Sequence, residues 1–413
     1  MTFSRFRADV AAAAGRLRGT GQAVLACDDT YAFAVGWFAL LHVGADIVLP
    51  PNGQSGTLAA FADRSILVVD DTVLSITPAP NARFQMLDLN RRRIIFHTSG
   101  STGTPKRITR TLGMLQRESE TLQRVWGDCA GTEPVRATVS HQHLYGLAFR
   151  LLWPLSAGRP FDATTDAVWE TLLPKLGNGA MLISSPAHLG RLVGIHPVAS
   201  DRRPSLVFSA GAPLSRDAAV MCDAILGCRP TEIFGSTETG AMAARRPNDG
   251  DEPWKLLPDT AIRCDNDGRM AVCSPYGRRE WQQTEDVVEP AADGFRFIGR
   301  ADRIVKIEGK RVSLPEVEAA LEALPLVAAA AVVLLPGLPA RLGGLLVLTQ
   351  EGRARLDQLG GFRFARLLRG DLARTFDPAG LPRSWRFADA LPMQAMGKRA
   401  SAEIVALFGH ASP

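Results

Sequence analysis

The sequence has 413 residues, of which 46% are hydrophobic and 22% are charged. This composition is typical of globular proteins and excludes disordered, fibrous and collagen-like chains. The length exceeds what one ordinary core holds, so a large domain followed by a smaller one is expected. The net charge is +5, but the Arg residues are spread along the chain without interleaved aromatic residues, so no nucleic-acid partner is predicted.

The longest strongly apolar run covers residues 326–335 and is bracketed by Pro325 and Pro336. It has about half of the roughly 20 residues that cross a bilayer, so it predicts a buried strand and no membrane span. Residues 1–18 lack the continuous apolar stretch and the cleavage site of a secretory signal, so a cytoplasmic location is expected. The six cysteines form no C-x-x-C pair, which favours reduced structural thiols.

The N-terminal half alternates short β-rich apolar runs with helical stretches, which is the pattern of an α/β layered fold. The clearest strand and helix segments cover residues 23–27, 31–42, 46–49, 58–62, 66–69, 94–98, 181–184, 206–209 and 232–234. Ligands of such sheets gather at the carboxyl ends of the strands. Turn residues then become frequent over residues 245–297, which predicts a small β-rich subdomain.

A second, compact α+β stretch follows residue 300. It is expected to hold a helix near residues 315–323, strands at 327–335 and 345–348, an amphipathic helix around 354–372 and a final helix from Ala400. The predicted architecture is therefore a large α/β domain over residues 1–300 and a smaller α+β domain over residues 301–413.

A run of small and hydroxylated residues follows the first strand of the second set and ends in a lysine. It reads Thr98-Ser99-Gly100-Ser101-Thr102-Gly103-Thr104-Pro105-Lys106. Small residues let backbone N–H groups approach a ligand, and the hydroxyls and the Lys106 ammonium add donors and charge, so the run suits a phosphate chain. It is not a Walker loop, because Pro105 precedes the lysine and Arg107 follows it, which disfavours an ordinary P-loop kinase.

This loop resembles the signature loop of the adenylate-forming superfamily of acyl-CoA synthetases, luciferases and peptide-synthetase adenylation domains. Further segments resemble the motifs of that family, in the same order and across nearly the whole chain. They are Ser209-Ala210-Gly211-Ala212-Pro213-Leu214, Phe234-Gly235-Ser236-Thr237-Glu238, Thr284-Glu285-Asp286, the segment from Gly299-Arg300-Ala301-Asp302 through Lys306 and Lys310 to Val312, and Leu391-Pro392-Met393-Gln394-Ala395-Met396-Gly397-Lys398.

The resemblance implies a role for each nucleotide-binding segment. The loop from Thr98 to Lys106 would bind the pyrophosphate. Gly211 and Ala212 would line the adenine pocket and Phe234 would stack on the adenine. Thr237 would contact the α-phosphate, Glu238 would hold Mg²⁺, and Asp286 and Arg300 would contact the ribose. Glu285 departs from the family, which has Gly at that position.

The resemblance also implies a mobile C-terminal domain that turns about Asp302 and delivers Lys398 as the catalytic lysine. Only six of the 47 basic residues are Lys. Four of them lie in the family-like segments, namely Lys106, Lys306, Lys310 and Lys398. This distribution indicates that a compact ammonium group is needed there, since Arg serves wherever plain positive charge is enough.

Two histidines lie in His141-Gln142-His143-Leu144-Tyr145-Gly146, which resembles the His-x-x-Gly stretch beside the acyl pocket of the family. His143 is the positional match and a candidate catalytic residue. Two close histidines also allow a metal-site hypothesis, but no Asp, Glu or Cys stands nearby in the sequence at ligand spacing.

The function implied by the resemblance is an ATP-dependent ligase that joins a small carboxylic acid to AMP and passes the acyl group to a thiol, with ATP and Mg²⁺ as cofactors. The thiol would belong to CoA or to an acyl carrier protein. The compact chain also resembles the ligases of aryl-polyene and xanthomonadin pathways, which implies an aryl acid such as a hydroxybenzoate. A ligase for fatty or other small acids and a non-catalytic nucleotide-binding relative remain alternatives.

Overall fold

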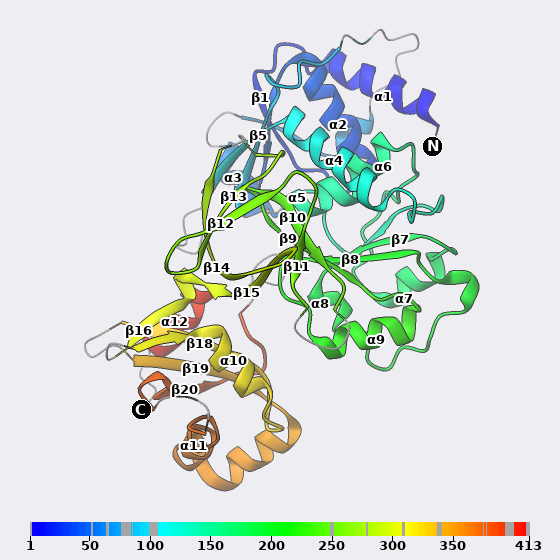
Figure 1. Cartoon of the computed structure of the whole chain (residues 1–413). Helices are drawn as coiled ribbons and strands as arrows, with labels where there is room; N and C mark the ends of the chain where they lie inside the picture. Colours follow the sequence, from blue (N-terminus) through cyan, green and yellow to red (C-terminus); the bar gives the residue numbers. More distant parts are fainter. Residues whose placement is uncertain are drawn as a thin grey trace.

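The computed structural model describes residues 2–50, 53–62, 66–75, 84, 86–98, 106–247, 252–277, 280–307, 310–336, 341–374, 376, 378–392 and 400–409. Figure 1 shows two large sheets with their helices, followed by a smaller group of elements at the C-terminal end of the chain. The predicted α/β class is confirmed. The division at residue 300 stays a prediction.

The first sheet has the strand order β3-β1-β2-β4-β5. Its strands are β1 (Gln22–Leu25), β2 (Asp46–Leu49), β3 (Leu67–Val69), β4 (Arg93–Thr98) and β5 (Lys106–Thr111). The first four strands are parallel and β5 is antiparallel to β4, with Thr98 opposite Lys106. The apolar run at residues 46–49 forms β2 at its predicted bounds.

The second sheet has ten strands in the order β12-β13-β14-β15-β11-β10-β9-β8-β7-β6. Its strands are β6 (Arg136–Ala137), β7 (Met181–Ser184), β8 (Leu206–Ala210), β9 (Thr231–Ser236), β10 (Gly240–Arg245), β11 (Trp254–Leu256), β12 (Ala261–Cys264), β13 (Arg269–Cys273), β14 (Gln282–Ala291) and β15 (Gly294–Arg300). Strands β6 to β9 are parallel, and β9 to β15 pair antiparallel. The segment that was expected to be β-rich forms β11 to β15, as predicted, and it continues the large sheet because β11 pairs with both β10 and β15.

The C-terminal elements form a three-stranded sheet of β18 (Val327–Leu335), β19 (Arg341–Leu348) and β20 (Ser384–Phe387), and a hairpin of β16 (Ile304–Ile307) and β17 (Lys310–Ser313). The apolar run at residues 326–335 forms β18, as predicted. Strand β19 begins at Arg341 and not at Leu345 as predicted. Two glycines weaken the strand pattern there, but a Cβ at Gly343 would lie 2.9 Å from the ring of Phe408, so the small residue lets α12 approach.

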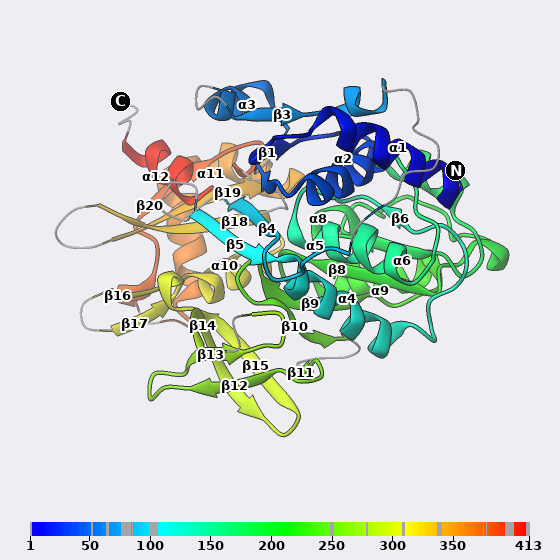
Figure 2. The same cartoon turned by 90° about the horizontal axis from the view of Figure 1, so that it is seen from above.

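The helices lie on the faces of the sheets (Figures 1 and 2). They are α1 (Phe3–Arg16), α2 (Thr30–Val43), α3 (Ser55–Ala62), α4 (Leu112–Trp126), α5 (Leu144–Gly146), α6 (Trp153–Ser156), α7 (Trp169–Leu172), α8 (Pro186–Leu189), α9 (Arg216–Leu226), α10 (Leu314–Glu322), α11 (Gln350–Leu372) and α12 (Ser401–Gly409). Figure 2 shows α1 and α2 on one side of the molecule and strands β12 to β15 on the other. No helix in the described ranges is both long enough and apolar enough to cross a bilayer.

Local chemistry explains where the helices begin and end. Helix α2 begins after Asp29, whose carboxylate accepts a hydrogen bond from the N–H of Ala32 at 2.8 Å, and it ends at Gly44 with φ of 88°. Both are common helix-capping arrangements. Helix α11 begins four residues before the predicted start because Thr349 caps it, with its hydroxyl accepting from the N–H of Gly352 at 3.1 Å.

Candidate functional site

The segments that resemble nucleotide-binding motifs follow the carboxyl ends of parallel strands. The loop after β4 ends at Lys106, the segment of Gly211 follows β8, and Thr237 and Glu238 follow β9. The carboxyl ends of β4, β8 and β9 therefore carry the predicted nucleotide-binding residues, and such strand ends are where α/β sheets bind ligands.

The first sheet contacts the second through Lys106 and Glu238, which are 132 residues apart in the sequence. The ammonium Nζ of Lys106 donates to Oε1 of Glu238 at 2.6 Å. Desolvation raises the pKa of Glu238, but the hydrogen bond and charge of Lys106, with hydrogen bonds from the turn, bring its net pKa below the ordinary value. The carboxylate is thus ionised at neutral pH, and its side chain is 36% exposed.

The turn between β9 and β10 is held by its own side chains. The N–H of Ser236 donates to the hydroxyl of Thr239 at 3.1 Å, and the N–H of Thr239 donates to the hydroxyl of Ser236 at 3.2 Å. Gly240 closes the turn with φ of 73°, in the left-handed region that favours glycine. This reciprocal pattern fixes the backbone on either side of Thr237 and Glu238.

The segment of Gly211 and Ala212 is fixed by a buried carboxylate. Glu232 on β9 accepts from the N–H of Leu214 at 2.8 Å and pairs with Arg245 at 2.7 Å. Gly211 has φ of 97° and an exposed backbone. A small residue in that conformation lets a flat ligand approach the main chain.

Phe234 lies on β9, where the second sheet changes from parallel to antiparallel strands. Its ring contacts three other aromatic rings: Trp254 at 5.0 Å, Phe295 at 5.2 Å and Phe297 at 5.4 Å between centroids. The ring is half-buried, so part of its surface is available for contact with a base. The edge-to-face neighbours hold it in one orientation.

Asp286 and Arg300, both predicted to contact a ribose, face each other across β14 and β15. They are partners in the strand register, and Nη1 of Arg300 lies 3.5 Å from Oδ1 of Asp286. The N–H of Asp286 donates to the hydroxyl of Thr284 at 3.2 Å, which keeps the threonine of the motif beside the aspartate. The departure at Glu285 leaves this pairing in place, because Glu285 points to solvent on the exposed side of the strand.

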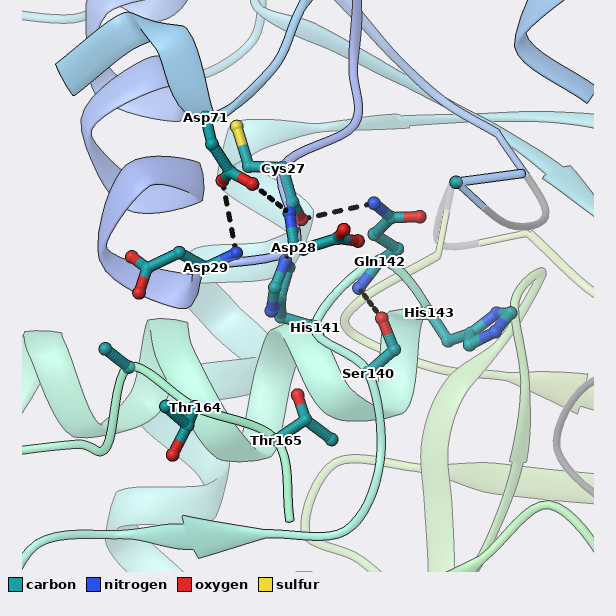
Figure 3. Close-up of a pocket in the computed structure, with 12 residues that line it drawn as sticks. Cys27, Asp28, Asp29, Asp71, Ser140, His141, Gln142, His143, Thr164 and Thr165 are labelled. Atoms are coloured by element: carbon teal, nitrogen blue, oxygen red, sulfur yellow. Dashed lines mark hydrogen bonds between the residues drawn. The ribbon is translucent and has the colours of Figure 1, made fainter. Parts of the chain in front are cut away.

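A cavity of about 650 Å³ lies beside the two histidines, at the ends of β1, β3 and β6. Figure 3 shows its lining, in which the carboxylate of Asp71 accepts from the backbone N–H groups of Asp28 and Asp29 at 3.2 and 3.1 Å. Thr164 and Thr165 form the opposite wall. His143 lines this cavity and precedes α5, with its ring pointing away from His141.

His141 is a structural residue. Its side chain is 1% exposed, Nε2 donates to the carbonyl of Cys27 at 2.8 Å, and Nδ1 accepts from the hydroxyl of Thr30 at 3.0 Å. The carbonyl can only accept, which assigns the proton to Nε2. Burial, reinforced by the charge of Arg150, lowers the pKa of His141 to about 3. The metal-site hypothesis for the two histidines gains no support, because their rings do not converge and no group of three metal-binding side chains occurs among the described residues.

Several predicted residues lie outside the described ranges. They are Ser99, Gly100, Ser101, Thr102, Gly103 and Lys398. The side chain of Thr98 is likewise outside the described part, although its backbone pairs with Lys106. Their predicted roles therefore remain predictions.

The structure adds a residue pair that sequence reasoning missed. Arg110 on β5 and Glu118 on α4 are both buried and form an ion pair at 3.5 Å beside the turn of Thr237. A signal existed in the sequence, because Glu118 falls between Leu115 and Leu122 on the apolar face of the helix, where a lone carboxylate needs a partner.

Comparisons with known proteins agree with this geometry. Residues 62–278, more than half of the chain, match the family model described as AMP-binding enzyme. The 4-coumarate–CoA ligase of Rhodobacter capsulatus is 31% identical over 316 residues, which are 74% of this chain and 74% of that protein.

Solved structures share the fold over almost the whole chain. The ATP-bound RpMatB-BxBclM chimera B3 has a TM-score of 0.83 and 19% identity, covering 99% of this chain and 93% of its own. A benzoate CoA ligase from Burkholderia xenovorans LB400 has a TM-score of 0.77 and 21% identity, covering 97% of this chain and 93% of its own. At these identities the likeness establishes the fold.

Proposed function

The chain belongs to the AMP-binding enzyme family and is an acid–thiol ligase, and we propose that it activates an aryl acid with ATP before passing the acyl group to a thiol. The observation that carries the proposal is the contact of Lys106 with Glu238 at 2.6 Å. This contact joins the end of a phosphate-binding loop to an ionised carboxylate on a different sheet. Such a pair of opposite charges at strand ends suits a nucleotide with a metal ion.

In the first step, an oxygen of the substrate carboxylate forms a bond to the α-phosphorus of ATP. The bond from that phosphorus to the bridging oxygen breaks, and pyrophosphate leaves. Little covalent work falls to the protein, so the residues act by position and charge. Lys106 and its loop hold the leaving phosphates, Thr237 contacts the α-phosphate, and Lys398 neutralises the charge on the reacting oxygens.

The nucleoside end of ATP is held by residues on the antiparallel strands. Asp286 accepts hydrogen bonds from the ribose hydroxyls, and Arg300 beside it orients the carboxylate. Phe234 contacts the adenine beside Gly211. These contacts also bind AMP and the acyl-adenylate, so they retain the intermediate between the two steps.

The residues present fit a Mg²⁺ ion that arrives with the nucleotide. Glu238 supplies an ionised carboxylate oxygen, which is the ligand that Mg²⁺ prefers, and the remaining ligands would be phosphate oxygens and water. When bound, the ion offsets phosphate charge and orients the leaving group. Lys106 neutralises Glu238 in the absence of the ion.

In the second step, the thiol releases its proton to water and its sulfur forms a bond to the acyl carbon, while the bond from that carbon to the AMP oxygen breaks and AMP leaves. The acceptor is CoA or the thiol arm of an acyl carrier protein. Helix α11 carries the exposed residues Arg353, Arg355, Arg363 and Arg366, a basic surface that suits either phosphates or an acidic protein.

The choice of an aryl acid rests on two of the relatives named above, which are described as ligases of 4-coumarate and benzoate.

Pyrophosphate exchange into ATP, measured with a panel of hydroxybenzoates, cinnamates and fatty acids, tests the proposal. Aryl acids should support exchange, and the exchange should require Mg²⁺. Exchange with fatty acids alone would show that the aryl proposal is wrong. ATP binding without exchange would identify a non-catalytic relative, and the absence of ATP binding would contradict the whole proposal.

Lys398→Ala tests the lysine that lies outside the described residues. Because this side chain is expected to neutralise the reacting oxygens, acid-dependent exchange should fall by about 10² to 10³. Thioester formation from supplied acyl-adenylate should persist, since the oxygens that Lys398 is expected to neutralise react only in the first step. Lys175→Ala, which removes an ammonium that binds Asp166 at 2.6 Å, is the matched control. Equal exchange rates in the two variants would contradict the assignment.

A further inference from the structure

Strand β5 contacts the turn of Thr237 and Glu238 with two side chains. Lys106 and Arg110 are four residues apart in a strand, so they point to the same face. Lys106 reaches the carboxylate of Glu238, and Nη1 of Arg110 donates to the backbone carbonyl of Thr237 at 3.2 Å. One strand of the first sheet thus contacts two successive residues of a turn in the second.

Arg110 is buried where three segments meet. Its side chain is 2% exposed, and Nη2 donates to the backbone carbonyl of Tyr276, after β13, at 2.8 Å. The same Nη2 lies 3.5 Å from Oε2 of Glu118 on α4. The guanidinium therefore connects α4, the turn after β9 and the segment after β13 through one planar group.

Glu118 contacts the other end of the turn. It is 2% exposed, and Oε1 accepts from the N–H of Ala241 at 2.8 Å. A Cβ at Gly240 would lie 3.1 Å from both of its carboxylate oxygens, so the turn packs directly on the charge. Arg110 and Glu118 together bind the backbone before and after Glu238.

The stability of the fold does not by itself explain why an ion pair is buried at Arg110 and Glu118. A buried ion pair costs desolvation free energy, and apolar residues of similar volume are often as stable or more stable. A pair of charges does, however, fix donors and acceptors in direction, which apolar side chains cannot do. The atoms that it fixes are the backbone groups on either side of the proposed phosphate- and metal-binding residues.

We propose that Arg110 and Glu118 are positioning residues that hold the turn of Thr237 and Glu238 in the geometry that binds the phosphates of ATP with its metal ion. The inference rests on the proposed function of that turn. It adds a second layer of residues to the site. Side chains on α4 and β5 fix the conformation of the turn, and the turn binds the phosphates. Partners of ligand-binding groups commonly matter for affinity and rate.

The experiment compares the binding of ATP with Mg²⁺ and of adenosine, by calorimetry, in the wild type, Arg110→Met and Arg110→Lys. Adenosine lacks the groups that the turn contacts, so its affinity should be unchanged. Affinity for ATP with Mg²⁺ should fall about 10- to 100-fold in Arg110→Met, as for other outer-layer partners. Arg110→Lys should recover part of the loss, because one ammonium can still donate to the carbonyl of Thr237.

The double variant Arg110→Met with Glu118→Met separates positioning from stability. Its unfolding temperature should return toward that of the wild type, whereas its affinity for ATP with Mg²⁺ should stay low. Arg136→Met, which breaks the ion pair with Asp162 beside β6, controls for general loss of a partly buried pair and should leave both affinities unchanged. If Arg110→Met fails to fold, Arg110→Lys and the double variant carry the test.

Two results would overturn the inference. In the first, every Arg110 variant keeps the wild-type ratio of the two affinities. In the second, the double variant regains ATP affinity together with stability. A wild type that binds ATP but does not exchange pyrophosphate would contradict the proposed function and leave this measurement valid, whereas a wild type that binds no nucleotide would overturn both.

Discussion

The carboxylate of Glu238 is charged although most of its surface is covered by protein, because Lys106 stabilises the ionised form. Glu238→Gln keeps the size of the side chain and removes the charge. Exchange activity should therefore fall by about 10² to 10³, as when one preorganised charge is removed from other active sites. Pyrophosphate exchange at saturating acid, over a range of Mg²⁺ concentrations, measures the loss.

Glu120→Gln is the control for this variant, because Glu120 is exposed on α4, where its carboxylate accepts a hydrogen bond from the side chain of Gln116 at 2.8 Å. The control should keep wild-type exchange and wild-type stability. An active Glu238→Gln enzyme with unchanged dependence on Mg²⁺ would remove Glu238 from the metal site.

His141 makes the stability of the fold depend on pH. Its pKa falls from 6.5 in the unfolded chain to about 3 in the fold, chiefly through burial. Between these values the unfolded chain binds a proton that the folded chain does not, so acidification below pH 6.5 destabilises the fold. The contribution reaches about 1.4 kcal/mol per pH unit.

Urea unfolding of the wild type and His141→Gln from pH 7.5 to 5 measures this contribution. The glutamine variant should be less stable at neutral pH, because it loses the pair of hydrogen bonds to Cys27 and Thr30. Its free energy of unfolding should fall less steeply with acidification. Parallel curves would show that His141 does not titrate on unfolding.

The contacts of single residues differ in how well they can be predicted from the sequence. Lys106 and Glu238 stand in motifs, and the structure brings them together as neighbours. Arg110 stands in an alternating polar strand, Lys106–Thr111, that looks like an exposed edge. Its acceptors at Thr237 and Tyr276 are 127 and 166 residues away, so no local pattern could predict the contact.

At the scale of elements, the apolar runs predicted strands well where a short run is buried on both faces of a parallel sheet, as in β2 and β7. The short, turn-rich segments after Arg245 were also correctly predicted to be β-rich, but their pairing partners could not be predicted from the sequence. Their place in the large sheet depends on β11, whose three residues carry no distinctive pattern.

Two glycines of α11 should respond to the same substitution with opposite signs. A Cβ at Gly352 would lie 2.0 Å from the backbone carbonyl oxygen of Leu326, so Gly352→Ala must shift the helix and should cost about 1–3 kcal/mol. A Cβ at Gly370 would meet nothing within 4 Å. Gly370→Ala should stabilise the fold by about 0.4–1 kcal/mol, by reducing the freedom of the unfolded chain.

Thermal or urea unfolding of the two variants checks both signs in one experiment. Each variant serves as the control for the other, because both positions are helical and the chemical change is the same. The two positions lie on either side of a kink at Gly360, which has φ of 71°. Equal effects would mean that α11 does not pack on the segment of Leu326 in solution.

At the scale of the whole molecule, the basic surface of α11 and the helix α1 lie at opposite ends (Figure 1). If the thiol acceptor is an acidic carrier protein, Arg363→Glu with Arg366→Glu should slow transfer by about 10-fold or more, since steering by charge raises association rates by 10 to 10³. Formation of the acyl-adenylate should not change. Thioester formation with carrier protein and with CoA, at low and high salt, measures the effect.

Arg16→Glu with Arg18→Glu on the α1 side makes the same change in net charge at exposed positions and is the control. It should leave transfer unchanged. A loss that appears equally in both double variants would reflect the charge of the molecule as a whole and not a docking surface on α11.

Strand β11 joins the parallel and antiparallel parts of the ten-stranded sheet by two register pairs with β10 and two with β15. By comparison, β14 and β15 share a ladder of six. The connection between the two parts should therefore open most easily at Trp254–Leu256, where the fewest residue pairs join them. Amide hydrogen exchange there should report opening of the sheet before its parallel strands lose protection.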